Sequence, residues 1–264
     1  MIDLHSHLLP AVDDGAASVE VTAAMLAKAR DTGFSIMAAT PHLPGPLSSA
    51  YRDRVETAFE QTRALAVAFG VEVRLGYEVA LSPDLPDRLE RGEPSTLGGG
   101  SAVLVDLPFV GWPHHAEETL FALQVAGFQP ILAHPERYAE VQRDPRRVAG
   151  LVERGVVLQV TISSLAGVFG KAAQRCAEQM LRQDMVHLVA TDAHSAGHRF
   201  AAVPAGLQRL RELVGDERLA QLVETVPRAL LAGDPLPALS PVSSRNRSDG
   251  WLSGLVAAVR GRSR

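Results

Sequence analysis

The sequence predicts an α/β fold made of repeated strand–helix units with parallel strands. Seven short apolar runs recur along the chain, and most are rich in valine, isoleucine and leucine without alternating polar residues. Such runs are typical of strands that are covered on both faces. Helical segments separate them up to about residue 195, which favours either a β/α barrel or a doubly wound sheet. The expected strands are Ile2–Leu4, Ser35–Ala39, Val71–Gly76, Ala102–Leu107, Pro130–Ala133, Val156–Val160 and Val186–Thr191.

The segments between these runs carry helix signals. Apolar side chains recur at helical spacing between residues 55 and 69, and Gly70 follows as a stop signal. Asp144-Pro145 is typical of an N-cap followed by proline at the first helical position. Gly127 and Gly155 each stand where a helix is expected to end and a strand to begin. The chain therefore alternates between the two element types, as a strand–helix repeat requires.

The last thirty residues differ in character, so we expect a main domain over residues 1–234 and a tail over 235–264. Proline, serine and arginine are prominent up to Ser248. Beyond that, five apolar residues between Trp251 and Val259 fall on one helical face. We expect a frayed tail with a short amphipathic helix that docks on the domain. A helix that lies on a membrane surface or binds a partner is the less favoured alternative.

Composition excludes several classes of protein. A net charge of -4 gives no basic face for nucleic acid. The single cysteine, Cys176, excludes an intrachain disulfide and a cysteine-based zinc motif, so histidine nitrogens rather than thiolates must serve as the softer ligands of any bound metal. No signal peptide is recognisable in the opening residues, and no apolar run approaches the roughly 18 to 20 residues of a membrane span. We therefore expect a cytoplasmic protein without stable membrane insertion; the oligomeric state is left open.

Residue types that bind metals stand at the ends of the expected strands, where strand–helix repeat folds carry their reactive groups. His5-Ser6-His7 ends the first strand, and alternation along an extended segment points both imidazoles to one side. Asp192-Ala193-His194 repeats this geometry with one carboxylate. Buried polar groups are costly without partners, so this concentration predicts bound divalent metal ions. The other candidates are Asp14 (in Asp13-Asp14-Gly15), His42, Glu78, Asp106 and His134.

These motifs resemble those of the PHP (polymerase and histidinol phosphatase) superfamily, and more narrowly the bacterial tyrosine phosphatases of the CpsB/CapC type. The resemblance covers residues 1 to about 200 and implies a distorted seven-stranded β/α (TIM-like) barrel, with a PHP metallophosphatase domain over residues 1–234. The motifs that carry it are Ile2-Asp3-Leu4-His5-Ser6-His7-Leu8-Leu9-Pro10, Val12-Asp13-Asp14-Gly15, Ala39-Thr40-Pro41-His42, Gly76-Tyr77-Glu78, Ala133-His134-Pro135-Glu136-Arg137-Tyr138 and Thr191-Asp192-Ala193-His194.

The resemblance implies a cluster of three divalent ions, and its ligand sets are carried over by position. The first ion is expected to bind to His5, His7, Glu78 and Asp192. Glu78 is expected to bridge to a second ion, which also binds to Asp106 and His134. The third ion is expected to bind to Asp14, His42 and His194. Ligation by nitrogen and oxygen suits manganese, iron or zinc, and of these we expect manganese. Such ions activate water for in-line attack on phosphorus, so no phosphoenzyme is required. Arg137 and Arg199 resemble the family's catalytic, phosphate-binding arginines, whose forked donors a lysine could not reproduce.

Two positions depart from the family pattern. Asp106 stands where the closest relatives tend to have glutamate, so its carboxylate reaches less far toward an ion. Leu43 follows His42 where relatives often show a second histidine. Neither departure removes a whole ligand set.

By resemblance, the function is hydrolysis of phosphotyrosine on proteins, in control of capsule or exopolysaccharide synthesis. The implied partner is the tyrosine-rich tail of a bacterial polysaccharide-export kinase. One alternative is a small-molecule phosphomonoesterase such as a histidinol-phosphate phosphatase, and another is a non-catalytic metal-binding or kinase-docking module. An amidohydrolase-type barrel is disfavoured because the only lysines, Lys28 and Lys171, fall in helical segments rather than at a strand end.

We give structural interpretations to five other residues. Cys176 and Arg182 have the spacing of cysteine-based tyrosine phosphatases, but the residues between them are helix formers without glycine, so we interpret the spacing as chance. His114 and His115 are expected to begin a helix or line a loop. His187 is expected in the core or paired. Glu136 is expected to orient His134 or Arg137 rather than to act directly.

Overall fold

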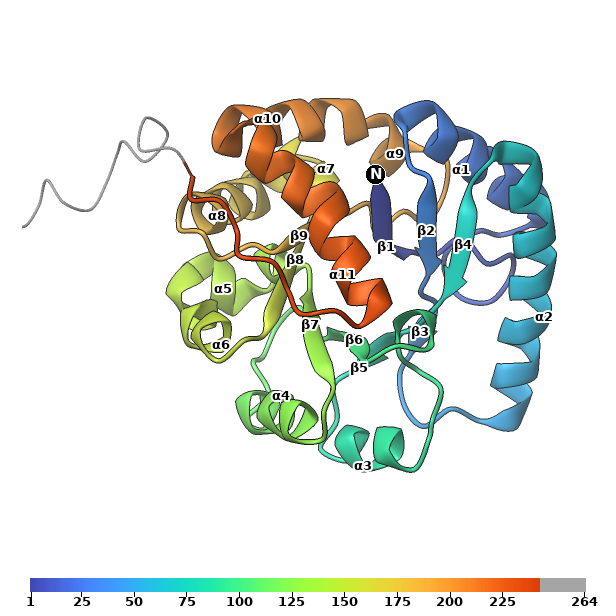
Figure 1. Ribbon diagram of the computed structural model, residues 1–264, viewed down its shortest axis with the longest axis horizontal. Coiled ribbons are helices and arrows are strands. Elements are labelled where there is room, and N and C mark those ends of the chain that lie inside the picture. Colours follow the sequence, from blue (N-terminus) through green and yellow to red (C-terminus); the bar gives the residue numbers. More distant parts are fainter. Residues whose placement is uncertain (243–264) are drawn as a thin grey trace, which may run out of the picture.

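The computed structural model describes residues 1–242 and shows parallel strands surrounded by helices (Figure 1). Every neighbouring pair within its two sheets is parallel. The smaller sheet has the order β1 (Ile2–Ser6), β2 (Ile36–Ala39), β4 (Glu72–Leu75). The larger has the order β3 (His42–Leu43), β5 (Glu78–Ala80), β6 (Ala102–Asp106), β7 (Gln129–Ala133), β8 (Val157–Thr161), β9 (Leu188–Ala190). The seven expected strands are all present within two residues of their predicted ends, and β3 and β5 are short additions.

Helices cover the outside of the strands, as the alternating pattern predicted (Figure 1). Gly127 and Gly155 adopt the left-handed backbone at the predicted helix ends, with φ of 86° and 87°. Asp144 caps as expected, but Pro145 begins a 3-10 turn that precedes the α-helix. The helices are α1 Val19–Thr32, α2 Ser49–Ala66, α3 Leu85–Glu90, α4 Ala116–Val125, α5 Ala139–Arg143, α6 Ala149–Glu153, α7 Ile162–Leu165, α8 Gly170–Arg182, α9 His198–Ala201, α10 Val203–Ala220 and α11 Val226–Ala232.

Most strands bury both faces, which explains their continuous apolar character; β4 is the exception, with Glu72 and Arg74 exposed. Alternate residues such as Ile2 and Leu4 of β1 belong to one apolar cluster, to which α11 contributes Val226 and Leu230. A second cluster joins strand residues such as Val103 to the surrounding helices. The strand ends are thus held between two packed layers, and this packing fixes where the side chains at their carboxyl ends can lie.

The α/β architecture with parallel sheets is confirmed, but a closed seven-stranded barrel is not. On one side, the two sheets meet at an isolated bridge between Ser6 and Ala193, with backbone hydrogen bonds from His7 N to Ala193 O and from Asp192 N to His5 O, both 2.8 Å. On the other side, Pro41 separates β2 from β3. Proline has no N–H to donate to a ladder, so the strand is interrupted where the sheet would have to continue.

Residues 235–242, the described part of the expected tail, contain no helix or strand but contact the domain. Ser240 N donates to Gln221 Oε1 at 2.8 Å, Arg218 donates to Ser240 O at 3.1 Å, and Val242 is buried. This stretch is therefore anchored rather than frayed. The predicted amphipathic helix near Trp251 lies outside the described residues. Within residues 1–242, no helix combines the length and the apolar character needed to cross a membrane.

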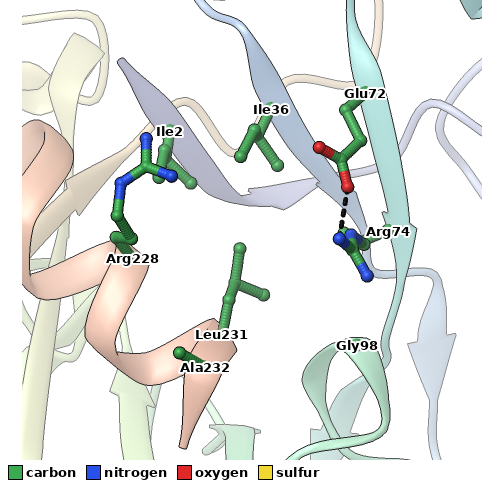
Figure 2. A pocket seen from close by; sticks show the side chains of 8 residues that line it. All are labelled: Ile2, Ile36, Glu72, Arg74, Gly98, Arg228, Leu231 and Ala232. Atoms are coloured by element: carbon green, nitrogen blue, oxygen red, sulfur yellow. Dashed lines mark ion pairs between the residues drawn. The ribbon is translucent and has the colours of Figure 1, made fainter. Parts of the chain in front are cut away.

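A small pocket opens at the amino-terminal ends of β1, β2 and β4 (Figure 2). Its charged side chains have partners: Glu72 pairs with Arg74 at 2.5 Å, and Arg228 pairs with Glu224. The remaining lining is largely apolar, from residues such as Ile36 and Leu231. In parallel α/β folds the chemistry is found at the opposite, carboxyl-terminal ends of the strands.

Candidate metal centre

The predicted ligand residues converge from separate strands onto one location. His5 and His7 come from the end of β1, and Glu78 begins β5. His134 follows β7, and Asp192 and His194 follow β9. Three overlapping groups of potential ligand atoms lie there. Within each group, all ligand atoms lie within 4.8 Å of one another, and together the groups include eight of the nine predicted residues. Asp106 is the one predicted residue that joins none of these groups.

The first group is buried and compact. His5 Nε2 lies 3.2 Å from His7 Nε2, 3.3 Å from Glu78 Oε2 and 3.4 Å from Asp192 Oδ1. His7 Nε2 lies 3.3 Å and 3.5 Å from the same two oxygens. The four side chains that we assigned to a first ion therefore aim their ligand atoms at a common point.

The second group is centred on His134, and it shows the effect of the shorter aspartate. His134 Nε2 lies 2.9 Å from Glu78 Oε1 but 3.8 Å from Asp106 Oδ1. The same Asp106 oxygen accepts a hydrogen bond from the Tyr138 hydroxyl at 2.9 Å. Asp106 thus lies at the edge of the group, as its short side chain led us to expect.

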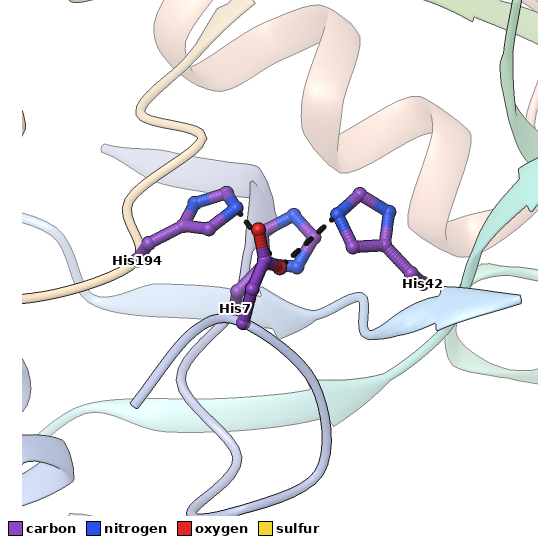
Figure 3. A group of neighbouring side chains, drawn as sticks. His7, His42 and His194 are labelled. Atoms are coloured by element: carbon purple, nitrogen blue, oxygen red, sulfur yellow. Dashed lines mark ion pairs between the residues drawn. The ribbon is translucent and has the colours of Figure 1, made fainter. Parts of the chain in front are cut away.

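The third group is more open to solvent. Figure 3 shows His7, His42 and His194 turned toward one another around a carboxylate. Asp14 Oδ1 lies 3.3 Å from His42 Nε2 and 3.5 Å from His194 Nε2, and the Asp14 side chain is 68% exposed. His7 belongs to this group as well as to the first, which joins the two groups through one imidazole. A ligand entering from solvent reaches this part of the centre most easily.

His5 in β1 and His7 directly after it present lone pairs to the centre. His5 Nδ1 lies 2.8 Å from Gln159 Oε1, and His7 Nδ1 lies 2.7 Å from Asp13 Oδ2. Both partner atoms are acceptors, so each Nδ1 carries a hydrogen, and in the neutral form of each ring the Nε2 lone pair faces inward. Two lone pairs and two carboxylate oxygens then face one another without a donor between them. Cations satisfy this arrangement, and the donor set therefore fits metal ions.

The electrostatics of the centre favour positive charge. Burial opposes protonation of His5, but the carboxylates of Glu78 and Asp192 raise its pKa. Burial also opposes protonation of His7, yet the hydrogen bond to Asp13 and the same two carboxylates raise the pKa of His7 well above its usual value. The carboxylates therefore stabilise cationic charge at the point where the ligand atoms meet.

Both predicted arginines lie beside Asp192. Arg137 Nη1 is 2.5 Å from Asp192 Oδ2, and Arg199 Nη1 is 3.0 Å from the same oxygen. The ring of Phe169 contacts both guanidinium groups, at 4.3 Å from Arg137 Cζ and 5.1 Å from Arg199 Cζ. Two planar cations are thus held at the edge of the ligand cluster, where they could bind the oxygens of a phosphoryl group.

The sequence matches a known family over most of its length. The model of the family described as capsular polysaccharide synthesis, CpsB/CapC, matches residues 1–232. The chain belongs to the CpsB/CapC family. This result confirms the resemblance inferred from the motifs.

Relatives of this CpsB/CapC chain are tyrosine-protein phosphatases. It is 31% identical over 226 residues to tyrosine-protein phosphatase YwqE of Bacillus subtilis (strain 168), covering 85% of this chain and 89% of that protein. It is 26% identical over 238 residues to tyrosine-protein phosphatase CpsB of Streptococcus pneumoniae, covering 88% and 98%. Its structure is similar to a crystal structure described under "YwqE from Bacillus subtilis and CpsB from Streptococcus pneumoniae, unique metal-dependent tyrosine phosphatases". The TM-score is 0.83 at 30% identity, and the match covers 92% of this chain and all of that chain.

Several residues of this CpsB/CapC site were not assigned a role from the sequence. Asp13, which precedes the predicted ligand Asp14, holds His7. Gln159, a polar residue inside an apolar strand, holds His5. Asp3 is fully buried and accepts hydrogen bonds from Thr191 N at 3.0 Å and His5 N at 3.2 Å, so it ties the first strand to the last motif. A charged or amide side chain within an apolar strand was the signal for the last two.

The backbone is constrained where the ligands are attached. His134 and Asp192 have positive φ of 33° and 49°, which is costly for residues other than glycine and recurs at functional sites. Gly15 is needed for another reason: an added Cβ would lie 2.1 Å from His7 O and 2.4 Å from His7 Cβ. Only glycine lets the loop that carries Asp13 pass this close to His7.

The interpretation of the Cys176 spacing as chance is confirmed. The expectation that Glu136 orients His134 or Arg137 is wrong, because its carboxylate binds other groups. Cys176 is buried within α8, whose amides are engaged in the helix, so no phosphate-binding loop surrounds the thiol. Glu136 Oε1 accepts from Thr161 N at 3.0 Å and from Ser164 Oγ at 2.6 Å rather than from His134 or Arg137. It therefore fixes the turn after β7 to the end of β8.

The expectations for the other histidines and for the two lysines agree with the structure. His187 Nδ1 accepts a hydrogen bond from Leu158 N at 3.1 Å, so this histidine is paired. His114 and His115 lie in the turn that begins α4. Lys28 and Lys171 lie in α1 and α8, so neither stands at a strand end, where an amidohydrolase-type site would need it.

Proposed function

We propose that this chain is a metal-dependent tyrosine phosphatase that hydrolyses phosphotyrosine on proteins. Family membership and the similarity to the tyrosine-protein phosphatases YwqE and CpsB support the activity and the substrate class. The observation that carries the metal dependence is the pairing of His5 Nε2 and His7 Nε2 at 3.2 Å, with both Nδ1 atoms bound to acceptors. That arrangement requires positive charge at the centre of the site.

We further propose three divalent ions, with manganese as the ion that suits this ligand chemistry best. The proposed ligands are His5, His7, Glu78 and Asp192 for the first ion, Glu78, Asp106 and His134 for the second, and Asp14, His42 and His194 for the third. The distances within each set support this division. When bound, such ions lower the pKa of coordinated water and neutralise phosphoryl oxygens.

The chain's own residues bind and orient the substrate. Arg137 and Arg199 offer forked N–H donors to the equatorial oxygens of the phosphoryl group, where charge accumulates during in-line transfer. Phe169 holds both guanidinium planes in place, which lowers the entropy lost on binding. Asp13 and Gln159 fix the tautomers of the two histidines at the end of β1. The buried first group excludes bulk water, while the open third group admits the substrate.

Two finer proposals concern the physiological setting. The substrate is the tyrosine-rich tail of a bacterial polysaccharide-export kinase, which rests on the family resemblance and on the match to a capsular polysaccharide synthesis family. Residues 1–234 form the catalytic domain, and residues 235–264 form a tail outside it. The family match over residues 1–232 supports that division.

The test compares metal content and turnover in the same preparations. We expect purified protein to contain bound divalent metal and to hydrolyse a phosphotyrosine peptide faster than histidinol phosphate. Chelation should abolish turnover and manganese should restore it. Asp192→Asn and His134→Ala should each lower kcat at least about 100-fold, whereas Asp216→Asn, on an 84% exposed side chain, should behave as wild type. Preference for histidinol phosphate would favour the small-molecule phosphatase, and a metal-loaded protein without turnover would favour the binding module.

A further inference from the structure

Two exposed apolar side chains lie in one loop, and one of them, Phe109, contacts residues of the candidate metal centre. Phe109 is 47% exposed and Val110 is 74% exposed, in the loop that follows β6. The other large exposed hydrophobics within residues 1–242 lie at the end of α2 or on α4. Among these exposed hydrophobics, Phe109 has ring contacts with the site residues Arg137 and His134. Exposing apolar area to water is unfavourable, so this position points to a ligand with an apolar part.

The loop holds these two side chains in a fixed position. Leu107 N donates to the Tyr138 hydroxyl at 3.0 Å, and Phe109 O accepts from Ala139 N at 2.9 Å. Beyond Val110, Gly111 N donates to Glu140 Oε1 at 3.1 Å. Bonds on both sides of the exposed pair anchor it to the segment that carries Arg137. A surface anchored in this way loses little entropy when a ligand binds to it.

The Phe109 ring lies beside the groups that would hold a phosphoryl group. Its centroid is 4.7 Å from Arg137 Cζ and 5.7 Å from the centroid of the His134 ring. In an aryl phosphate, the aromatic ring is separated from phosphorus by one ester oxygen. A phosphoryl group held by Arg137 therefore places its aryl group within reach of the Phe109 face, where offset or edge-to-face packing is favourable.

We infer that Phe109 forms the platform on which the aromatic ring of the substrate packs, and that this platform selects aryl over alkyl phosphate esters. The inference rests on the proposed function and adds a specificity-determining residue. The chemical class that the platform accepts is a phosphate monoester of a phenol, presented on an exposed tyrosine side chain. Phe109 does not touch the transferred group, so its contribution lies in binding and selection.

The test uses non-hydrolysable ligands that share the phosphoryl site and differ in the attached group. Dissociation constants of phenylphosphonate and methylphosphonate are measured calorimetrically with the manganese-loaded enzyme, together with kcat and KM for a phosphotyrosine peptide. In Phe109→Ala we expect phenylphosphonate to bind about 3- to 10-fold more weakly and methylphosphonate to change by less than about 2-fold. KM for the peptide should rise while kcat stays near the wild-type value. Phe109→Tyr, which keeps the ring, should restore phenylphosphonate binding.

The matched control is Phe121→Ala, because Phe121 is a 56% exposed phenylalanine on α4. Equal weakening of both phosphonates in Phe109→Ala would overturn the platform, because the side chain would then act only through Arg137. Unchanged binding of both, or no preference for phenylphosphonate in the wild type, would overturn it as well. Wild-type protein that prefers phenylphosphonate through Phe109 but does not hydrolyse the peptide would contradict the proposed function and leave the platform standing.

Discussion

Replacing Asp13 by asparagine should weaken metal binding without removing a metal ligand. The Asp13 carboxylate accepts three N–H groups: His7 Nδ1 at 2.7 Å and His42 N at 3.0 Å on Oδ2, and Gly15 N at 3.0 Å on Oδ1. Burial raises the pKa of Asp13, but the hydrogen bond from His7 and the other donors lower it to about 2, so the group is ionised at neutral pH. An asparagine offers one oxygen, and its NH2 must face at least one of these donors.

The size of the effect follows from the same contacts. His7 loses a charged acceptor, and such bonds are roughly twice as strong as neutral ones. Loss of the partner of a metal-binding histidine typically lowers metal affinity about 10- to 100-fold, which corresponds to ~1.4 to ~2.7 kcal/mol. We expect a loss of this size for manganese, with kcat at saturating manganese reduced far less than in Asp192→Asn.

The assay is calorimetric titration of manganese into metal-free protein, paired with activity measured against manganese concentration. Asp216→Asn makes the same chemical change at a distant exposed position and should not alter the affinity. Thermal unfolding of the metal-free proteins checks that the loop still folds. If folded Asp13→Asn binds manganese as tightly as the wild type, the hydrogen bond to His7 does not set metal affinity and the reasoning is refuted.

Three further predictions use other residues. Burial and the charge of Arg218 lower the pKa of His187 to about 4 in the folded protein. Between pH 4 and 6.5 the unfolded chain therefore binds more protons at this histidine than the folded protein does. The free energy of unfolding consequently falls as the pH is lowered through that window. His187→Asn, which can still accept from the backbone, should reduce the loss of unfolding free energy between pH 7 and 5 by about 1–2 kcal/mol in urea titrations. Burial, with Glu136 nearby, raises the pKa of Cys176 to about 12, so Cys176→Ser should retain activity and iodoacetamide should not inhibit at pH 7. Phe169→Leu should lower kcat/KM about 5-fold for aryl and alkyl phosphates alike, because Arg137 and Arg199 lose the aromatic ring that holds their guanidinium groups. An effect confined to aryl substrates would contradict this role of Phe169.

Much of the site could be predicted because its ligands are tied to strand ends. His5 and His7 alternate along one strand, and Asp192 and His194 repeat the pattern at another, so residue type and order alone placed them together. Closure of the barrel could not be predicted in the same way. It depends on whether hydrogen bonds continue past Pro41 and past Ser6, and apolar runs do not contain that information.

The partners of the ligands were harder to predict than the ligands because the chain is long between them. His5 and Gln159 are 154 residues apart and meet only after β8 has taken its place in the sheet. Phe109 and Phe169 converge on Arg137 from two different loops. A polar residue in an apolar strand can be noticed in the sequence, but the side chain that it will hold follows only from the strand order.

The two histidines at the end of β1 differ in a way that matters for the order of metal binding. His5 has a neutral amide as its Nδ1 partner, whereas His7 has an ionised carboxylate, which makes the His7 ring the more basic ligand. His7 is also shared between the buried first group and the open third group. An ion that enters from solvent therefore meets its strongest imidazole ligand at the boundary between the two groups. The pairing of Asp13 with His7 thus links the accessible part of the centre to the buried part.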